Sequence, residues 1–278
     1  MAPIALVTGT STGIGLSSAV LLAKAGFEVI ATLRNPEKAE RLRARAAAEN
    51  VRLDIRALDV ESDESVRQCV QGVLQRYGRI DVLVNNAGAG FLGSIEQTSP
   101  EALRRTMEVN FFGVWRMTQA VLPGMREQRS GRVISVTSIG GLIGQPFNDA
   151  YCAAKFAVEG FMESLAPVAQ KLGIHISLIE PGAVGTEFVN SVLSANNGMQ
   201  GELGPYRSMF DAYITRTKAR FDSAQTGDDV AKVIVEAATT AQPHLRYLTS
   251  DAIRGVARQK YVDVTGDSIL ALTRSVLS

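Results

Sequence analysis

The stretch Thr8-Gly9-Thr10-Ser11-Thr12-Gly13-Ile14-Gly15 decides the fold, because it joins a short apolar run to the start of a helical pattern. The preceding run, Ile4-Ala5-Leu6-Val7, is continuously apolar, which is typical of a strand covered on both faces of a sheet. The following residues have helical periodicity up to Ala25, and Gly26 ends the predicted helix. Glycines at such a turn let the backbone approach a phosphate group closely, and the helix N-terminus offers that phosphate free N–H groups.

The same alternation continues along the chain. Short apolar runs predict further strands at 27–33, 55–58, 82–84, 132–136, 174–179 and 246–248, and helical patterns lie between them, including 63–77, 149–172 and 228–238. A helical stretch from about 100 to 127 divides near Asn110. Repeated β-α-β units predict an α/β fold, a Rossmann-type doubly wound parallel sheet with helices on both faces, in a single domain over residues 1–278. The stretch 186–226 is rich in Ser, Asn and Gly, and we expect it to be an irregular substrate-binding loop or lid.

Composition excludes several classes of protein. The chain has 278 residues, a formal net charge of +1 and no dense basic run, so a nucleic-acid-binding surface is not expected. Neither Cys69 nor Cys152 lies in a CxxC or metal-ligand spacing, which predicts no metal site and a reducing, cytoplasmic location. No stretch approaches the about 18 to 20 apolar residues that a membrane span needs.

The glycine turn is a candidate nucleotide site. Its spacing is G-x-x-x-G-x-G rather than G-x-G-x-x-G, so an ordinary glycine-rich turn is the alternative, but its place after the first strand favours a nucleotide. Thr10, Ser11 and Thr12 could add hydroxyl donors. Where many such folds place an acid for a ribose hydroxyl, the chain has Leu33 followed by Arg34. A guanidinium can pair with a 2′-phosphate, so we predict NADP(H) in preference to NAD(H), with an exposed surface arginine as the alternative.

Polar residues also follow two neighbouring strands. Asp59 comes after the third predicted strand and Asn85-Asn86-Ala87-Gly88 after the fourth. Ligands in open α/β sheets bind at the carboxyl ends of the strands, which is where these residues fall. A helix cap for Asp59 and a turn residue for Asn85 are the alternatives.

Tyr151 and Lys155 lie four residues apart on a predicted helix and therefore share one of its faces. A free tyrosine has a pKa near ~10 and is a poor base at neutral pH, but a nearby ammonium favours the phenolate. Ser138 follows the fifth strand, thirteen residues before Tyr151, at the same ligand-binding edge. The Tyr-x-x-x-Lys spacing alone is weak evidence, and it gains weight only together with Ser138 and the glycine turn.

In this combination the sequence resembles the short-chain dehydrogenase/reductase family over roughly residues 3 to 190. The matching motifs, in family order, are Thr8-Gly9-x-x-x-Gly13-x-Gly15, Asp59-Val60, Asn85-Asn86-Ala87-Gly88, Asn110, Ser138, Tyr151-x-x-x-Lys155 and Pro181-Gly182-x-x-x-Thr186. A shorter match, Ala31-Thr32-Leu33-Arg34, resembles the branch of 17β-hydroxysteroid and retinol dehydrogenases that prefer NADP(H).

The resemblance implies a catalytic role for each of four residues. Tyr151 would be the general acid in reduction and the base in oxidation, and Ser138 would hydrogen-bond the substrate oxygen. Lys155 would bind ribose hydroxyls and lower the Tyr151 pKa, and Asn110 would hold a water in a proton relay. Asp59 and Val60 would contact adenine, Asn85 would support the sheet, and the residues after the sixth strand would frame the nicotinamide. The expected cofactor contacts are Gly9, Thr10, Ser11, Thr12, Gly13, Ile14, Gly15, Arg34, Asp59, Val60, Asn86, Ala87, Gly88, Tyr151, Lys155, Pro181, Gly182, Val184 and Thr186.

The predicted function is hydride transfer between NADP(H) and the carbonyl or alcohol group of an apolar substrate, such as a steroid, a retinoid or another ketone or aldehyde. We expect the substrate pocket to form from 90–91, 140–147 and 186–226. The side chains expected to line it, each with ordinary core packing as the alternative, are Phe147, Phe188, Met209, Phe210 and Tyr213.

Three alternatives stay open: an NAD-dependent alcohol dehydrogenase, a nucleotide-sugar epimerase or dehydratase, and a non-catalytic cofactor-binding regulator. Epimerases and dehydratases usually have G-x-x-G-x-x-G spacing, and silent regulators usually lose the tyrosine or the lysine. Family members commonly form dimers or tetramers through the helices expected at about 100 to 127 and 149 to 172, so a homo-oligomer is expected.

Overall fold

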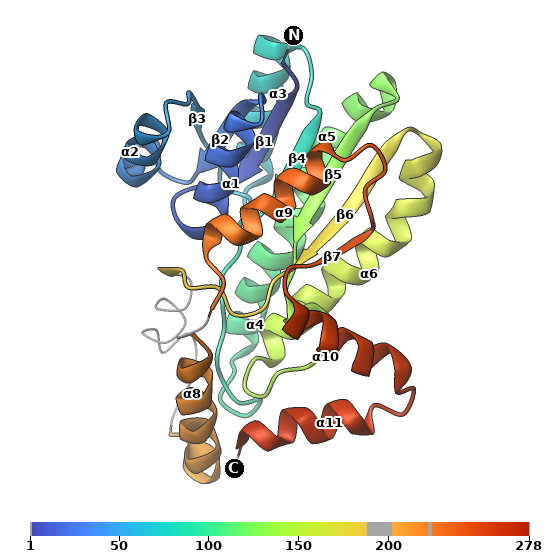
Figure 1. Ribbon diagram of the computed structural model, residues 1–278. Helices are drawn as coiled ribbons and strands as arrows, with labels where there is room; N and C mark the ends of the chain where they lie inside the picture. The colour runs from blue at the N-terminus through green and yellow to red at the C-terminus, as the bar shows by residue number, and fades with distance from the viewer. Residues whose placement is uncertain (1, 188–201, 222–223, 278) are drawn as a thin grey trace.

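The computed structural model describes residues 2–187, 202–221 and 224–277, which form one sheet of seven parallel strands with helices on both faces (Figure 1). The predicted fold class is confirmed, and each predicted strand lies within one residue of its observed bounds. The strand order is β3-β2-β1-β4-β5-β6-β7. The strands β2 and β3 therefore lie on one side of β1, and the strands from β4 onward lie on its other side. The strands are β1 (Ile4–Thr8), β2 (Glu28–Leu33), β3 (Asp54–Ala57), β4 (Val82–Asn85), β5 (Gly131–Val136), β6 (Ile174–Glu180) and β7 (Arg246–Leu248).

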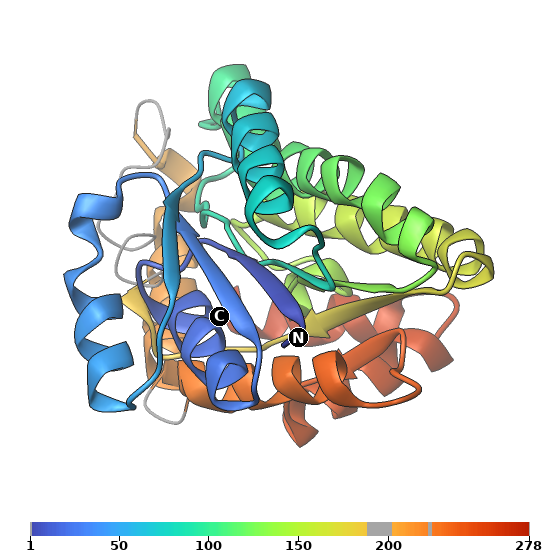
Figure 2. The ribbon, with the colours of Figure 1, turned by 90° about the horizontal axis from the view of Figure 1, so that it is seen from above.

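Alternate residues of the central strands feed two separate cores. Leu6, Leu83 and Val133 pack with α3 (Asp63–Tyr77), α5 (Gly113–Gln128) and α6 (Asp149–Lys171) on one face. Their neighbours Val7, Val84 and Ile134 pack with α1 (Gly13–Lys24), α2 (Glu40–Ala48) and α9 (Gly227–Thr239) on the other face. Figure 2 shows these two helical layers on either side of the sheet. Because both faces are covered, the strands are apolar throughout rather than alternating.

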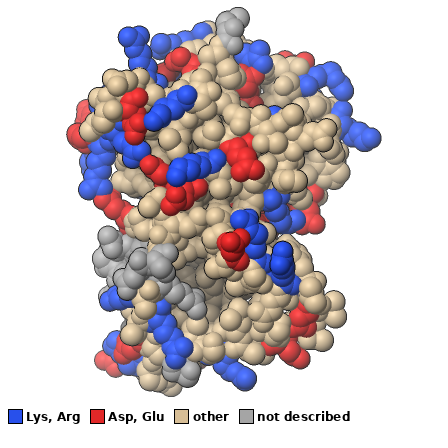
Figure 3. All heavy atoms as spheres, in the orientation of Figure 1, with Lys and Arg blue, Asp and Glu red and all other residues tan. Residues whose placement is uncertain are grey.

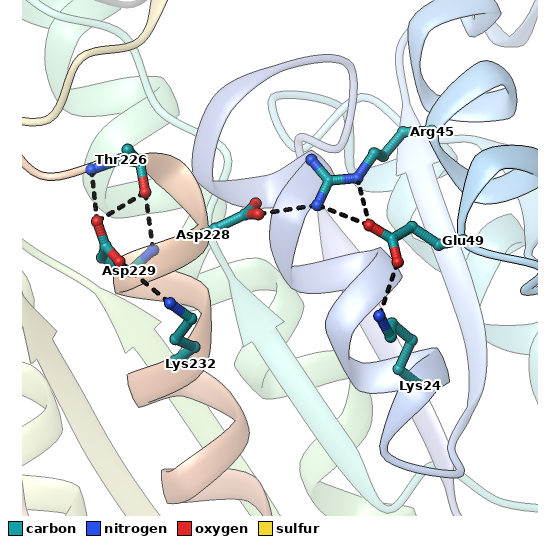
Figure 4. A network of polar contacts seen from close by, with 7 residues as sticks. All are labelled: Lys24, Arg45, Glu49, Thr226, Asp228, Asp229 and Lys232. Carbon is teal, nitrogen blue, oxygen red and sulfur yellow. Dashed lines mark hydrogen bonds and ion pairs between the residues drawn. The ribbon is translucent and has the colours of Figure 1, made fainter.

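A polar network ties α9 to the N-terminal helices (Figure 4). Arg45 of α2 pairs with Asp228 at the start of α9 at 2.8 Å and with Glu49 at 3.1 Å. Lys24 at the end of α1 pairs with Glu49 at 2.7 Å. The network therefore joins α1, α2 and α9 on the face of the sheet that carries the glycine turn.

The helical stretch between β4 and β5 divides at Asn110, as predicted. It consists of α4 (Pro100–Met107), a π-helical turn η2 (Glu108–Phe112) and α5. The wider π-helical turn places the fully buried Asn110 side chain toward the loop after β4, where it contacts the backbone of Ala89. A π-helical turn inside a helix often marks a functional position.

The expectation of an irregular segment at 186–226 is wrong for its second half. Residues 207–221 form the helix α8 (Arg207–Phe221), preceded by a short 3-10 helix, η4 (Gly204–Tyr206). Tyr213 is buried on α8, and Met209, Phe210 and Ile214 pack beside it. These contacts in the folded chain stabilise α8, although its sequence has only a weak helical periodicity of apolar residues. The remaining C-terminal elements are α10 (Asp251–Val262), α11 (Asp267–Arg274) and a 3-10 turn, η5 (Ser275–Leu277).

Candidate active site

A cleft of about 1150 Å³ opens at the carboxyl ends of the strands. In Figure 1 this edge faces α8, α10 and α11, and Figure 3 shows the surface hollowed between the sheet body and these helices. Most of the residues predicted for the site line the cleft: Gly9, Ser11, Thr12, Gly13, Ile14, Gly15, Arg34, Asp59, Val60, Asn86, Ala87, Gly88, Ser138, Tyr151, Lys155, Pro181, Gly182, Val184 and Thr186. Two predicted residues, Thr10 and Asn110, do not.

The glycine turn is shaped by close backbone contacts. Gly9 has a φ of +71°, and a Cβ atom added there would lie 2.8 Å from the Cα atom of Ala87. Gly13 has a φ of +57°, and its Cβ would lie 3.1 Å from the Cβ atom of Thr186. The Asn86 amide donates to the carbonyl oxygens of Thr8 at 2.9 Å and Gly9 at 3.0 Å. The turn therefore sits between the loops that follow β4 and β6.

The start of α1 suits an anion. The side chain of its N-cap residue, Thr12, makes no capping hydrogen bond, and the first turn of α1 has no acidic residue. By contrast, Ser62 caps α3, whose first turn carries Asp63 and Glu64. The first N–H groups of a helix need an outside acceptor, and the helix dipole favours a negative charge there. The described residues thus fit a dinucleotide whose phosphates lie against the glycine turn.

The prediction for Thr10 needs correction. Its side chain is fully buried, and its hydroxyl donates to the carbonyl oxygen of Thr32 at 3.1 Å. The Thr10 amide donates to the same oxygen at 3.0 Å. Thr10 therefore links the turn to β2 and has no hydroxyl to offer a phosphate, whereas Ser11 and Thr12 reach the cleft.

Leu33 and Arg34 border the cleft where the chain leaves β2. Leu33 is buried, while Arg34 is exposed and pairs with no carboxylate among the residues that the structure describes. Asp59 also borders this end, and its carboxylate accepts from the Glu61 amide at 3.1 Å. Since Ser62 is the residue that caps α3, the helix-cap alternative for Asp59 is wrong.

Asn85 lies inside the sheet rather than in a turn. It is the last residue of β4 and is buried, and its amide donates to the hydroxyls of Thr118 and Ser135 at 3.2 Å each. It thereby connects β4 to α5 and β5 below the floor of the cleft.

Ser138, Tyr151 and Lys155 converge at the centre of the cleft. Ser138 follows β5, and its hydroxyl accepts from the Gly140 amide at 3.0 Å. Tyr151 and Lys155 lie on the first turns of α6, and the Lys155 Nζ atom is 5.6 Å from the centre of the Tyr151 ring. The Lys155 ammonium donates to the carbonyl oxygen of Val136 at 3.1 Å. A tyrosine, a serine and a buried lysine thus share one small volume.

Burial dominates the electrostatics of Tyr151 and Lys155. Burial raises the pKa of Tyr151 to about 12, although a hydrogen bond with Ser138 acts to lower it. Burial lowers the pKa of Lys155 to about 8, although the Glu159 carboxylate acts to raise it. The pKa of Tyr151 is raised on balance, because loss of water around the phenol outweighs the hydrogen bond with Ser138, and the lowering that the resemblance implies for Lys155 stays a prediction. At neutral pH Tyr151 is a neutral acid with a proton to give.

Asn110 lies behind this group rather than in the cleft. Its amide donates to the carbonyl oxygens of Ala89 at 2.8 Å and Thr106 at 2.9 Å, and its Oδ1 atom accepts from the Ala89 amide at 3.2 Å. A Cβ atom on Gly88 would lie 2.8 Å from this Oδ1 atom and 3.7 Å from the Lys155 Nζ atom. Asn110 and Lys155 therefore meet across Gly88.

The rest of the cleft is mostly apolar, and its walls come largely from residues that the sequence patterns did not single out. Phe91, Phe147, Met209 and Phe210 do not line it, which corrects the expectation for them, and Phe188 lies outside the described residues. Phe147 instead packs behind Tyr213, which does reach the cleft, with 5.8 Å between the ring centres. Lining residues that fall in the ranges predicted for the pocket include Ile143, Gln145, Pro146 and Thr217. Lining residues outside those ranges include Leu92, Asn148, Ile253, Val256, Leu272, Thr273 and Val276.

No helix in the described ranges is both long and apolar enough to cross a membrane. No group of three or more His, Cys, Asp or Glu side chains within those ranges is placed to hold a metal ion.

Comparison with known proteins gives consistent matches. A family model described as "short chain dehydrogenase" matches residues 3–197. Retinol dehydrogenase 8 of Homo sapiens is 40% identical over 98% of this chain and 89% of its own length. The human 17-beta-hydroxysteroid dehydrogenase type 1 is also 40% identical, over 98% of this chain and 85% of its own length. The crystal structure of a short-chain dehydrogenase from Streptomyces avermitilis superposes with a TM-score of 0.81 at 31% identity, covering 99% of this chain and 97% of that one.

Proposed function

Because the chain belongs to the short-chain dehydrogenase family and is an oxidoreductase of that family, we propose that it transfers a hydride between NADP(H) and the carbonyl or alcohol group of an apolar substrate. The part of the cleft lined by apolar residues such as Leu92, Ile143 and Val276 is called the substrate chamber below. The observation that carries this proposal is the convergence of Ser138, Tyr151 and Lys155 between the glycine turn and this chamber. A cofactor on the turn and a substrate in the chamber would meet at the Tyr151 hydroxyl.

The nicotinamide, when bound, supplies or accepts the hydride. In reduction Tyr151 donates its proton to the carbonyl oxygen, since its raised pKa keeps the phenol neutral. Ser138 donates a hydrogen bond to the same oxygen as negative charge develops on it. Lys155 remains largely protonated at neutral pH and holds a positive charge beside the phenol, which helps Tyr151 to give up its proton.

Support for NADP(H) over NAD(H) comes from the adenosine end. Arg34 is exposed there, borders the cleft and has no carboxylate partner among the described residues. Leu33 stands where an acid for the ribose 2′-hydroxyl would be expected. A 2′-phosphate would satisfy the Arg34 guanidinium, whereas a 2′-hydroxyl would leave it in water.

The proposed substrate is an apolar ketone, aldehyde or alcohol of the size of a steroid or retinoid. Support comes from the apolar side chains that line the cleft, among them Leu92, Ile143, Val256, Leu272 and Val276. The names of the two 40% identical relatives point to the same substrate class. The segment 186–226, with α8 as its described helix, would act as the lid of this chamber.

We also propose a homodimer or homotetramer in a reducing, cytoplasmic compartment. Both cysteines are buried and unpaired, which suits such a compartment. The helices expected to form the subunit contact, α4, α5 and α6, together with η2 between α4 and α5, carry exposed apolar side chains, of which Phe112 and Trp115 are each 44% exposed. Exposed aromatic groups on packed helices are typical of a protein contact.

The test is turnover of NADPH with a panel of steroid, retinoid and aromatic carbonyl compounds. Tyr151→Phe should lower kcat by roughly 10²- to 10⁴-fold, the usual contribution of a general acid, and should leave NADPH binding, followed by its fluorescence, within a few-fold. Tyr77→Phe, on α3 and outside the cleft, is the matched control and should retain activity. A Tyr151→Phe enzyme that keeps kcat within a few-fold of the parent would refute the mechanism. NADPH binding without turnover of any compound would favour a non-catalytic regulator, and turnover of a nucleotide sugar would favour an epimerase or dehydratase.

A further inference from the structure

Two glutamates are buried together on the far side of Lys155 from the cleft. Glu159 is 5% exposed on α6, and Glu180 is fully buried at the end of β6. Arg246 of β7 lies between them, with its guanidinium 3.2 Å from a carboxylate oxygen of each. Arg246 also pairs with Glu163 at 2.7 Å, but that carboxylate is 61% exposed. The buried part of the cluster thus holds two carboxyl groups and one guanidinium.

The hydrogen bonding of this cluster is incomplete if both carboxyl groups are ionised. Both oxygens of Glu180 and the Oε1 atom of Glu159 are buried, and no well-aligned donor among the described residues reaches them. A second uncompensated negative charge in such a place is strongly unfavourable. One proton between the two side chains would turn one acceptor into a donor and leave a single carboxylate to face Arg246. The geometry thereby calls for one proton on the pair.

The pair lies next to the segments that carry Lys155 and Ser138 and to the loop after β6. Glu159 follows Lys155 by one helical turn on the same face of α6. Its carboxyl group lies beside Thr137, the residue before Ser138, and a Cβ atom on Gly141 would lie 3.3 Å from its Oε1 atom. Glu180 directly precedes Pro181, where the loop that lines the cleft begins.

We propose that Glu180, as the protonated acid, donates a hydrogen bond to the Glu159 carboxylate, and that this pair positions Lys155 and preserves its positive charge during catalysis. Glu159 and Glu180 are positioning residues, since neither lines the cleft. The part of the inference that concerns turnover rests on the proposed oxidoreductase function. The shared proton itself does not.

The electrostatic environment agrees with this arrangement. Burial and the neighbouring Glu159 raise the pKa of Glu180 to about 8, and burial raises the pKa of Glu159. The charged and titratable groups that face the pair are Arg246 from β7, Lys155 and Glu163 from α6, and Tyr261 from α10. The Glu159 charge acts to raise the pKa of Lys155, against the lowering caused by burial. Without that charge, Lys155 would lose its proton at a lower pH.

The first experiment looks for the proton without any substrate. Infrared difference spectra of the folded protein between pH 7 and pH 9.5 should contain the C=O stretch of a protonated carboxylic acid that disappears at the higher pH. Glu180→Gln should abolish this band, and Glu163→Gln, which removes the exposed carboxylate from the same arginine, should leave it unchanged. Absence of the band from the parent protein, or its survival in Glu180→Gln, would overturn the shared proton.

The second experiment measures kcat/KM against pH with NADPH and a ketone that the parent enzyme reduces. Glu159→Gln should move the alkaline limb to lower pH by at least half a pH unit, and Glu159→Asp should restore much of that shift. Glu180→Gln should leave the limb unmoved or at higher pH, because its amide still donates to the Glu159 carboxylate. A purely structural role would lower stability in both Gln variants and move neither limb, which would overturn the positioning role. A protein without turnover would contradict the proposed function, while the infrared result would still decide whether the proton is shared.

Discussion

Arg34 tests the choice of cofactor at the scale of a single residue. A charge-assisted hydrogen bond contributes about 1.5 to 3 kcal/mol, which corresponds to roughly 10- to 100-fold in affinity. Arg34→Ala should therefore raise the KM for NADPH by at least about 10-fold and change the KM for NADH by less than about 2-fold. Arg43→Ala is a suitable control, because Arg43 is exposed on the nearby α2 and lies outside the cleft. Equal losses with both cofactors would contradict the pairing with a 2′-phosphate.

Glu180 links the stability of the protein to pH. Its pKa is raised to about 8 in the folded state, so between its ordinary value of 4.5 and 8 the folded state holds a proton that the unfolded state releases. The stability that this group contributes is complete below about pH 4.5 and is lost as the pH rises toward 8, with a slope of at most about 1.4 kcal/mol per pH unit.

Replacement of Glu180 by Gln should remove this dependence. Chemical unfolding should be measured at intervals from pH 5 to pH 9. The free energy of unfolding of Glu180→Gln, relative to that of the parent, should increase as the pH rises. The free energy of unfolding of Glu163→Gln should have the same pH dependence as that of the parent, since this carboxylate is largely exposed. A constant difference between Glu180→Gln and the parent at every pH would argue against a buried, protonated Glu180.

Sequence patterns identified the residues whose roles depend on local spacing. The glycine turn and the Tyr151, Lys155 and Ser138 group follow from strand ends and from a four-residue helical interval, and the structure brings them to one cleft. The patterns misjudged Thr10, because the direction of a hydroxyl depends on a neighbouring strand. They could not reveal the cluster around Glu180, whose members come from α6, β6 and β7 and meet only in the folded chain.

At the scale of elements, the π-helical turn η2 supports the loop after β4. Three hydrogen bonds of the fully buried Asn110 side chain join this turn to Ala89 and Thr106. The loop they support contains Asn86, which in turn donates to the carbonyl oxygens of the glycine turn. A structural role of η2 is thus visible alongside the proton relay that the family resemblance implies for Asn110.

Asn110→Ala should accordingly lower the free energy of unfolding by about 2 to 4 kcal/mol, since each lost hydrogen bond contributes about 0.5 to 1.5 kcal/mol. Urea unfolding measures this effect. The exposed Gln119 of α5 provides the control, and Gln119→Ala should change stability by less than about 0.5 kcal/mol. An Asn110→Ala protein as stable as the parent would leave the relay as the only role for this residue.

The elements around the substrate chamber show where sequence patterns stop being informative. Central strands such as β1 and β4 are buried, mainly apolar runs because both faces of the sheet are covered, and all seven strands could be predicted to within a residue. α8, α10 and α11 lie beyond the sheet edge in Figure 1 and pack through small clusters, such as that of Tyr213 with Leu92 and Phe147. Such clusters depend on contacts distant in sequence, so α8 could not be predicted, and of the chamber walls only the parts in 140–147 and 186–226 could.

At the scale of the whole molecule, one helical face is not covered by any of the residues that the structure describes. α5 and α6 pack on the sheet through their inner sides, while Trp115 of α5 stacks on Phe161 of α6 at 4.5 Å between ring centres and remains 44% exposed. Phe112 and Phe156 are also exposed on this side of the fold, from η2 and α6. Single exposed apolar residues are ordinary, but several aromatic ones on adjoining helices favour a protein contact.

A second copy of the chain is the proposed occupant of this face, and Trp115 is the only tryptophan in the sequence. Trp115→Arg should convert the parent oligomer to a monomer in sedimentation velocity, because an unpaired charge in a closed contact between subunits is strongly unfavourable. Val264→Arg, at a more exposed site between α10 and α11, should leave the oligomer intact. In the parent protein, dilution should shift the tryptophan emission to longer wavelength as the oligomer dissociates and water reaches the indole. A parent protein that sediments as a monomer, or a Trp115→Arg variant that stays oligomeric, would place the subunit contact elsewhere or remove it.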